Sequence, residues 1–164
     1  MNYKDLSHED FDAIVTGELT HYALWLEDVI NGIICEYFIG MSDKEDDFRR
    51  LILYRDGLTF QDKIEIVRGM IPLFGEASEK CDLKGLLNEI EKFKSWRNAL
   101  AHGLDKSDEN EPLKLIVEVV TRSGKEKRIE ITPESHRQMC EETESLINKA
   151  NEARDVLRGS TKNA

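Results

Sequence analysis

The sequence predicts a mainly α-helical protein, a bundle of four to five helices with one β-hairpin inserted before the last helix. Long segments repeat apolar residues at helical spacing, and one short segment alternates apolar and polar residues. The chain has 164 residues, of which 40% are apolar and 34% are charged. It is therefore long enough to bury a core and too apolar to be disordered. We expect a single helical domain over residues 1–158 and a polar tail over residues 159–164.

The first helix is expected to be long. Ser7 precedes acidic residues and is a suitable N-cap, and Gly40 marks the C-terminal end. The apolar stripe between them recurs at Phe11, Ile14, Val15, Leu19, Tyr22, Leu26, Val29, Ile30, Ile33 and Tyr37. Because the stripe is broad, we expect the helix to be covered on more than one side, with Trp25 in the core.

Three further helical segments are expected in the middle of the chain. A short helix covers Phe48–Leu53, and Thr59 is the expected N-cap of the next helix, which Pro72 ends or kinks. Asp82 is expected to cap the third long helix. Gly103 stands at the end of that helix, where a left-handed C-terminal cap is expected.

A β-hairpin and a final helix complete the prediction. An acidic polar loop over residues 104–111 is followed by alternating apolar residues over 113–120, a turn over 122–125 and a returning strand over 128–131. Thr132 then precedes Pro133 and an acidic residue, a combination typical of a helix start. This last helix is expected to continue to Leu157.

The net charge and the cysteine content argue against several classes of function. A net charge of −10 disfavours nonspecific binding to duplex DNA, although a local basic patch can still contact a short stretch of RNA. Cys35, Cys81 and Cys140 are odd in number and far apart, which argues against a disulfide framework. Neither Cys-x-x-Cys nor His-x-x-x-His spacing occurs, so we expect no zinc site and no cofactor. Without a membrane-length apolar run or an apolar signal segment, we expect a cytoplasmic location without membrane contact.

The four histidines are expected in different environments. His21 lies beside the apolar stripe of the first helix and is expected at the edge of the core. His8 and His136 lie in first helical turns, where exposure to solvent is expected. His102 stands in the last turn of the third long helix, where the negative end of the helix dipole favours a protonated imidazole.

The most distinctive segment runs from Lys94 to Gly103. Asn98 and His102 are four residues apart and share a helix face, whereas Arg97 and His102 lie about 140° apart around a straight helix. A histidine that titrates near neutral pH can exchange protons with an RNA 2′-hydroxyl or a leaving 5′-oxygen. Arg97 offers a permanently charged fork for a phosphate. These groups are suited to cleavage of RNA without a metal ion.

The pattern of Arg97, Asn98 and His102 resembles the Arg-x4–6-His motif of the HEPN superfamily, whose commonest form has asparagine directly after arginine. The resemblance implies a small helical bundle that forms a homodimer and brings two motifs into one cleft. It implies that Arg97 contacts phosphate, that Asn98 is its polar neighbour and that His102 is catalytic. Many members are RNA-cleaving toxins or defence proteins, some with an antitoxin partner, and others are non-catalytic binding modules. The resemblance leaves open whether this chain is an enzyme.

Two features favour a non-catalytic alternative. HEPN toxins paired with nucleotidyltransferases often carry tyrosine two positions after the histidine, and here that residue is Leu104. The segment Thr59–Ile64, followed by the Arg-Asn-x-x-Ala-His run, also resembles the mannitol-operon-repressor group of helical regulators. Those proteins act through protein contacts, so a protein-interaction module or transcriptional regulator is the alternative function.

Basic residues around the motif and on the hairpin are candidate contacts to nucleic acid. They are Lys94, Arg122, Lys125, Lys127 and Arg128. A solvated turn is the favoured explanation of the hairpin cations, and an RNA-backbone contact is the functional alternative. The motif also has a structural interpretation, in which Arg97 pairs with Glu91 or Asp105 and His102 caps the last carbonyl groups of its helix.

Overall fold

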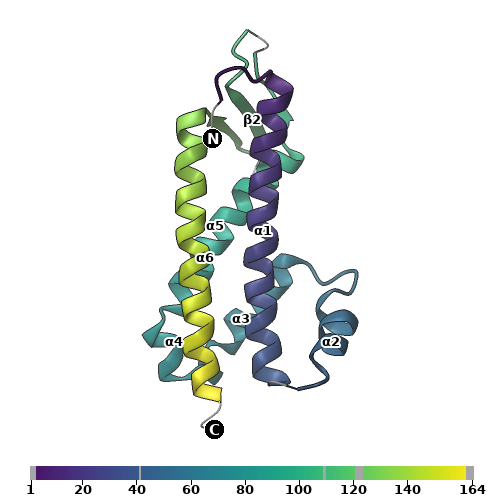
Figure 1. Ribbon diagram of the computed structural model, residues 1–164, viewed down its shortest axis with the longest axis vertical. Helices are drawn as coiled ribbons and strands as arrows, with labels where there is room; N and C mark the ends of the chain where they lie inside the picture. Colours follow the sequence, from purple (N-terminus) through teal and green to yellow (C-terminus); the bar gives the residue numbers. More distant parts are fainter. Residues whose placement is uncertain (1–2, 41, 109, 121–123, 162–164) are drawn as a thin grey trace. The chain divides into compact units, whose positions relative to one another are not determined.

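The computed structural model describes residues 3–40, 42–108, 110–120 and 124–161, and within these ranges the chain is mainly helical, as predicted. The chain divides into two compact units. The first unit holds residues 1–23 and 93–144, and the second holds residues 24–92 and 145–164. The three long helices are α1 (His8–Phe38), α5 (Leu83–His102) and α6 (Pro133–Thr161) (Figure 1). Each of them contributes residues to both units.

The helix starts of the first unit follow the predicted capping chemistry. The Ser7 hydroxyl oxygen accepts a hydrogen bond of 3.1 Å from the backbone N–H of Asp10, which satisfies one of the free donors at the start of α1. The Thr132 hydroxyl oxygen accepts one of 3.4 Å from the backbone N–H of Ser135 at the start of α6. At its other end α6 continues to Thr161, into the segment expected to be a tail.

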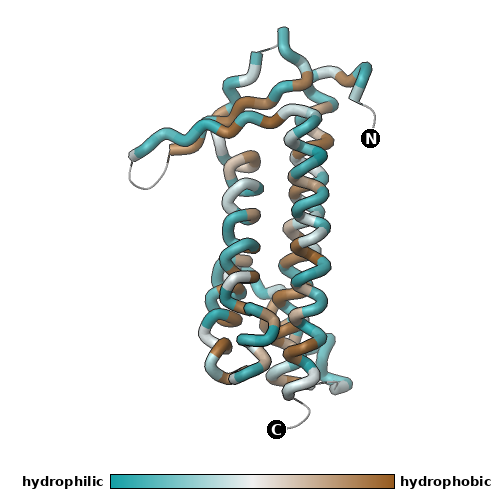
Figure 2. Tube along the Cα trace, turned by 90° about the vertical axis from the view of Figure 1, so that its left-hand side faces the viewer, coloured by the Kyte–Doolittle hydropathy of each residue, from teal (hydrophilic) through white to brown (hydrophobic). Residues whose placement is uncertain are grey.

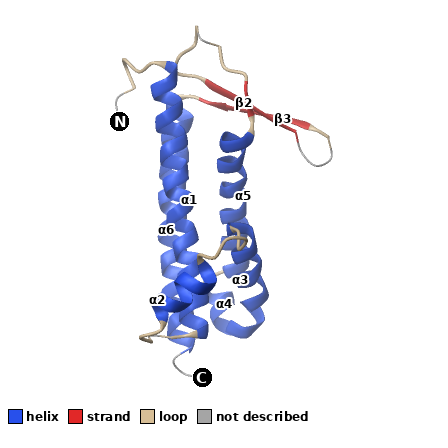
Figure 3. Ribbon diagram, turned by 90° about the vertical axis from the view of Figure 1, so that its right-hand side faces the viewer, coloured by secondary structure: helices blue, strands red, loops and turns tan. Residues whose placement is uncertain are grey.

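A small antiparallel sheet belongs to the first unit, with strand order β1-β2-β3. It comprises β1 (Leu104–Asp105), β2 (Leu115–Val120) and β3 (Glu126–Ile131). β2 and β3 form the predicted hairpin, in which Leu115 pairs with Ile131 and Val120 with Glu126 (Figure 3). The expected acidic loop was partly wrong, because its first two residues form β1 and pair with β2.

The core of the first unit lies between the helices and the hairpin strands. Its buried apolar residues are Tyr3, Phe11, Val15, Leu19, Ala23, Phe93, Ala99, Leu115, Ile116, Val117, Ile131 and Met139. Hydrophobic residues recur between hydrophilic ones along the helices (Figure 2), which is the periodicity that predicted them.

The second unit contains, besides segments of the three long helices, α2 (Glu45–Phe48), the π-helical turn η1 (Arg49–Leu53), α3 (Phe60–Phe74) and α4 (Glu76–Lys80). Thr59 and Asp62 form a capping box at the start of α3, each side chain accepting a hydrogen bond from the other's backbone N–H. Pro72 lies within the last turn of α3, which then ends at Phe74. The single short helix expected at 48–53 is instead α2 running into η1.

Buried charge distinguishes the second unit. The Lys63 side chain is almost fully buried, and its ammonium group pairs with the carboxylate of Glu27. Arg49 forms an ion pair of 3.1 Å with Asp28 and therefore ties η1 to α1. Trp25, which we expected in the core, is 49% exposed because the packing of α1 leaves that side open. None of the described helices has both the length and the low charge density needed to cross a lipid bilayer.

Candidate functional site

The Arg97–His102 motif occupies the last turns of α5, where the helix meets the sheet of the first unit (Figure 3). Ala99 is buried and anchors this turn, whereas His102 is exposed. The backbone N–H of Gly103 donates a hydrogen bond of 2.7 Å to the carbonyl of Ala99, and β1 begins at the next residue. The chain thus passes from helix to strand without a loop.

Gly103 is required by close packing. We expected a left-handed C-terminal cap, but Gly103 is absent from the described residues with positive φ, so this expectation was wrong. A Cβ atom at this position would lie 2.2 Å from Cγ1 of Val117 and 2.5 Å from the carbonyl oxygen of Ala99. Glycine therefore allows the end of α5 to lie directly against β2.

The guanidinium of Arg97 is held by an amide. Its Nη1 donates a hydrogen bond of 3.1 Å to Oδ1 of Asn98. Within the described ranges no carboxylate pairs with it, and its Nε is buried without a hydrogen-bond partner. The acids considered for a structural pair are engaged elsewhere, Glu91 with Arg68 and Asp105 with His8. The positive charge of Arg97 is therefore not neutralised by a neighbouring acid in the described part of the chain.

His102 stands at the C-terminal end of α5 with its side chain exposed. Among the residues that the structure describes, none forms a hydrogen bond or ion pair with its imidazole. Because α5 is a regular helix here, the separation of Arg97 and His102 around its axis stays at about 140°. One chain therefore presents the two side chains in different directions, while Asn98 lies on the face of His102.

The candidate cations do not all share one surface. Lys94 is half-buried on α5, whereas Lys125, Lys127 and Arg128 are exposed on the hairpin, and Arg122 lies outside the described residues. Side chains alternate along β3, so Lys127 and Arg128 point to opposite faces of the sheet. Lys127 pairs across the strands with Val119 and therefore shares the face of Val117, against which the end of α5 packs. Arg128 lies on the other face, opposite Glu118.

No family model, curated protein or solved structure matches this chain. The likeness to HEPN domains thus stays a prediction that rests on Arg97, Asn98 and His102.

A second group of polar side chains surrounds the buried His136 in the first unit, between α1 and α6. His136, which we expected to be exposed, is fully buried, because Tyr3 and Phe11 contact its ring edge-on. The Tyr3 hydroxyl lies 2.9 Å from its Nδ1, and its Nε2 lies 3.3 Å from Oε2 of Glu18. The Cys140 thiol donates to the same carboxylate oxygen at 3.3 Å. Sequence reasoning missed this cluster, although His136 and Cys140 are spaced to share one helix face.

Burial controls the protonation of this group. It lowers the pKa of His136 below its usual value, an effect that the Glu18 carboxylate opposes. Burial also raises the pKa of the Cys140 thiol to about 12, with Glu18 adding to the shift. At neutral pH the cluster therefore holds a neutral imidazole and a protonated thiol around one carboxylate. If Tyr3 donates its proton to Nδ1, the imidazole proton lies on Nε2 and faces Glu18, which satisfies every polar atom of the ring.

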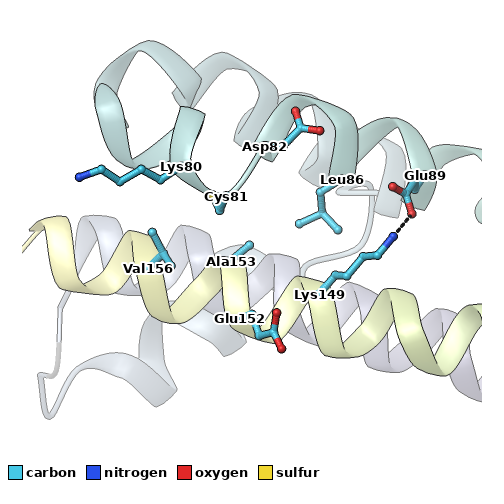
Figure 4. Close-up of a pocket in the computed structure, with 9 residues that line it drawn as sticks. All are labelled: Lys80, Cys81, Asp82, Leu86, Glu89, Lys149, Glu152, Ala153 and Val156. Carbon is cyan, nitrogen blue, oxygen red and sulfur yellow. Dashed lines mark hydrogen bonds and ion pairs between the residues drawn. The ribbon is translucent and has the colours of Figure 1, made fainter.

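The second unit contains a groove of about 430 Å³ (Figure 4). It lies between α6 on one side and the end of α4 with the first turns of α5 on the other. Its lining residues are Lys80, Cys81, Asp82, Leu86, Glu89, Lys149, Glu152, Ala153 and Val156. Lys149 and Glu89 form an ion pair of 3.0 Å across it. The Asp82 carboxylate accepts from the backbone N–H of Gly85 at 3.2 Å, in its predicted role as the cap of α5. Three of the charged lining residues, Lys149, Glu89 and Asp82, are thus engaged in local structure.

Proposed function

We propose that this chain is an RNA-acting protein of the HEPN type, a metal-independent endoribonuclease with a composite site formed by two copies. One observation carries the proposal: Arg97 is held by the Asn98 amide and not by a carboxylate, while His102 is exposed nearby on the same helix end. An arginine without an acidic partner keeps its charge available for a phosphate group. An exposed histidine keeps both ring nitrogens available for proton transfer.

The reaction follows from these two groups. The 2′-oxygen of a ribose attacks the adjacent phosphorus while an imidazole accepts its proton, so a 2′-O–P bond forms. The P–O5′ bond breaks, and a second imidazole, protonated, donates a proton to the leaving 5′-oxygen. The products are a 2′,3′-cyclic phosphate and a 5′-hydroxyl. Arg97 stabilises the charge that develops on the non-bridging phosphate oxygens.

A second copy of the chain supplies what one copy lacks. A single α5 holds Arg97 and His102 about 140° apart, and the reaction uses both a proton acceptor and a proton donor. Two motifs facing one cleft supply two histidines and two arginines. The exposed side chain of Leu104, two residues after His102, supports this arrangement, because an apolar side chain beside the motif favours a covered surface.

The test uses labelled single-stranded and structured RNA, with a chelator in the reaction and circular dichroism in the same buffer to verify folding. We expect fragments that end in 2′,3′-cyclic phosphate, and a loss of at least about 100-fold in rate for His102→Ala and for Arg97→Ala. His21→Ala is the matched control, since His21, which we expected at the edge of the core, is an exposed histidine on α1 of the same unit. Absence of cleavage, or cleavage that His102→Ala leaves intact, would refute the enzymatic proposal.

Mixing two inactive variants tests the composite site. In a heterodimer of Arg97→Ala with His102→Ala, one chain contributes the arginine and the other the histidine. We expect partial activity to return on mixing, in proportion to the heterodimer formed. If the mixture stays inactive although heterodimers form, the two motifs do not share a cleft.

The alternative, a protein-interaction module or regulator, is supported by exposed apolar side chains in the second unit. Leu51, Ile52 and Tyr54 are each about half exposed, and Tyr54 donates a hydrogen bond to Asp28 of α1. This surface is suited to contact with a protein such as an antitoxin or a second copy. Sedimentation at increasing concentration, with the double variant Leu51→Ser and Ile52→Ser as control, tests it. Association that the variant abolishes, together with no cleavage of RNA, favours this alternative.

A further inference from the structure

The partly buried cluster in the first unit brings three different metal-binding atoms together. They are Oε2 of Glu18 on α1, and Nε2 of His136 and Sγ of Cys140, which lie one turn apart on α6. All three atoms lie within 4.8 Å of one another. We propose that Glu18, His136 and Cys140 form a zinc-binding site. The site shares no residue with the Arg97–His102 motif, so neither proposal depends on the other.

The distances between the donor atoms have the size that zinc requires. The Cys140 sulfur lies 3.6 Å from His136 Nε2 and 3.3 Å from Glu18 Oε2, and Nε2 lies 3.3 Å from Oε2. With zinc bonds of about 2.3 Å to sulfur and about 2.0 Å to nitrogen and oxygen, tetrahedral angles separate the ligand atoms by about 3.5 Å and about 3.3 Å respectively. The three atoms thus already form one face of a zinc tetrahedron.

The donor set selects the kind of metal. Sulfur and imidazole nitrogen bind borderline ions such as Zn²⁺, whereas Mg²⁺ and Ca²⁺ require oxygen ligands throughout. On binding, the thiol of Cys140 releases its proton to solvent and the imidazole coordinates as a neutral ligand. One thiolate and one carboxylate then balance the two positive charges of the ion. A neutral site suits this location, because His136 is fully buried.

The surrounding residues orient the imidazole for this role. The Tyr3 hydroxyl lies 2.9 Å from Nδ1 of His136, which turns Nε2 toward Glu18 and Cys140. When Nε2 coordinates the ion, the ring proton moves to Nδ1 and is donated to the Tyr3 oxygen, as outer partners of zinc-bound histidines commonly accept it. The Glu18 side chain is 35% exposed, so an ion can enter from that side. Three protein ligands leave the fourth position to water.

Cobalt substitution tests the site directly. The untagged full-length protein is stripped with a chelator, dialysed and titrated with Co²⁺ as the probe, and Zn²⁺ is then used to displace it. We expect one Co²⁺ per chain, a thiolate-to-cobalt charge-transfer band in the near ultraviolet and the visible spectrum of a tetrahedral ion. Cys140→Ser removes the charge-transfer band, while Cys81→Ser keeps it, since the Cys81 thiol lies in the second unit.

Two further variants test the zinc site even if Cys140→Ser does not fold. Glu18→Gln replaces a partly exposed side chain with one of the same shape, and we expect it to weaken Zn²⁺ affinity at least about tenfold. Tyr3→Phe removes only the outer hydroxyl and is expected to weaken affinity about 10-fold to 100-fold. Absence of the charge-transfer band in the unmodified protein, its persistence in folded Cys140→Ser, or unchanged affinity in both further variants would overturn the zinc site.

Discussion

The two histidine sites of the first unit differ in how the fold treats them. His102 ends α5 with an exposed ring, next to residues that are its neighbours in sequence. His136 is fully buried, and its partners Tyr3 and Glu18 come from the opposite end of the chain. An exposed side chain contributes little to folding and is available for function, whereas a buried polar ring must be satisfied by partners or the fold loses stability. The comparison separates a site visible in sequence from one that only folding assembles.

The largest expected effect comes from removing each ring in turn. We expect His136→Ala to lower the free energy of unfolding by about 3 kcal/mol, because it leaves a cavity and strips Tyr3 and Glu18 of a buried partner. His102→Ala should change it by less than about 0.5 kcal/mol. Urea unfolding of both variants with chelator present measures the difference. Equal losses of unfolding free energy in the two variants would show that the difference in burial between His136 and His102 has no effect on stability.

The junction of α5 and β2 gives the next largest effect. We expect Gly103→Ala to cost about 2 kcal/mol, because its Cβ meets the backbone of Ala99 and the side chain of Val117. Gly17→Ala, in an open position of α1, should instead stabilise the chain by about 0.5 to 1 kcal/mol. Thermal and urea unfolding of the Gly103→Ala and Gly17→Ala variants measure the two changes in stability. If Gly103→Ala behaves like Gly17→Ala, the close approach of α5 to the sheet is not tight.

We expect a smaller effect from the hairpin cations, whose two faces should contribute differently to RNA binding. Lys127 lies on the sheet face that meets the end of α5, whereas Arg128 lies opposite Glu118, whose charge offsets its own. We expect Lys127→Ala to reduce the slope of log affinity against log salt by about 0.7, the value for one phosphate contact on a single strand. Arg128→Ala should change it less. Fluorescence anisotropy at several salt concentrations measures both slopes, and a larger change for Arg128→Ala would place RNA on the opposite face.

The smallest expected effect concerns acid stability beside the motif. Hydrogen bonds from Ser107, with a contribution from His8, lower the pKa of Asp105 below its usual value of 3.8. A lowered carboxyl pKa stabilises the folded state above the unfolded-state value, and this contribution is lost as the pH falls through the folded-state pKa. We expect Asp105→Asn to be slightly less stable than the unmodified chain at neutral pH. Their unfolding free energies should converge in strong acid, and a constant difference would contradict this.

Local chemistry made much of the fold predictable. Ser7, Thr59 and Thr132 start their helices as expected, because an N-cap needs only its own side chain and the next backbone N–H groups. The hairpin followed from its alternation and turn residues. The strand β1 was missed because a two-residue strand has no periodicity of its own and exists only through its pairing with β2.

Tertiary packing explains the rest. The position of His136 in the first turn of α6 predicted exposure, but Tyr3 and Phe11 cover that turn, and neither is near it in sequence. Gly103 follows the last residue of α5, as predicted, but not as a left-handed cap. Glycine is required there by its proximity to Val117, which is distant in sequence. The Arg97–His102 motif could be located from sequence because its residues are contiguous. The absence of an acid beside Arg97 among the described residues could not be predicted, because it depends on where Glu91 and Asp105 turn.

The close contact of Gly103 with Val117 also affects the entropy of any association at this end of α5. The main chain on either side of Gly103 is ordered before a ligand arrives, by the helix on one side and by the pairing of β1 with β2 on the other. A molecule that binds His102 therefore restricts only the rotamers of the imidazole and does not have to immobilise a loop. Such preorganisation favours the binding of small or weakly held groups, for which the cost of ordering a flexible segment would exceed the binding energy.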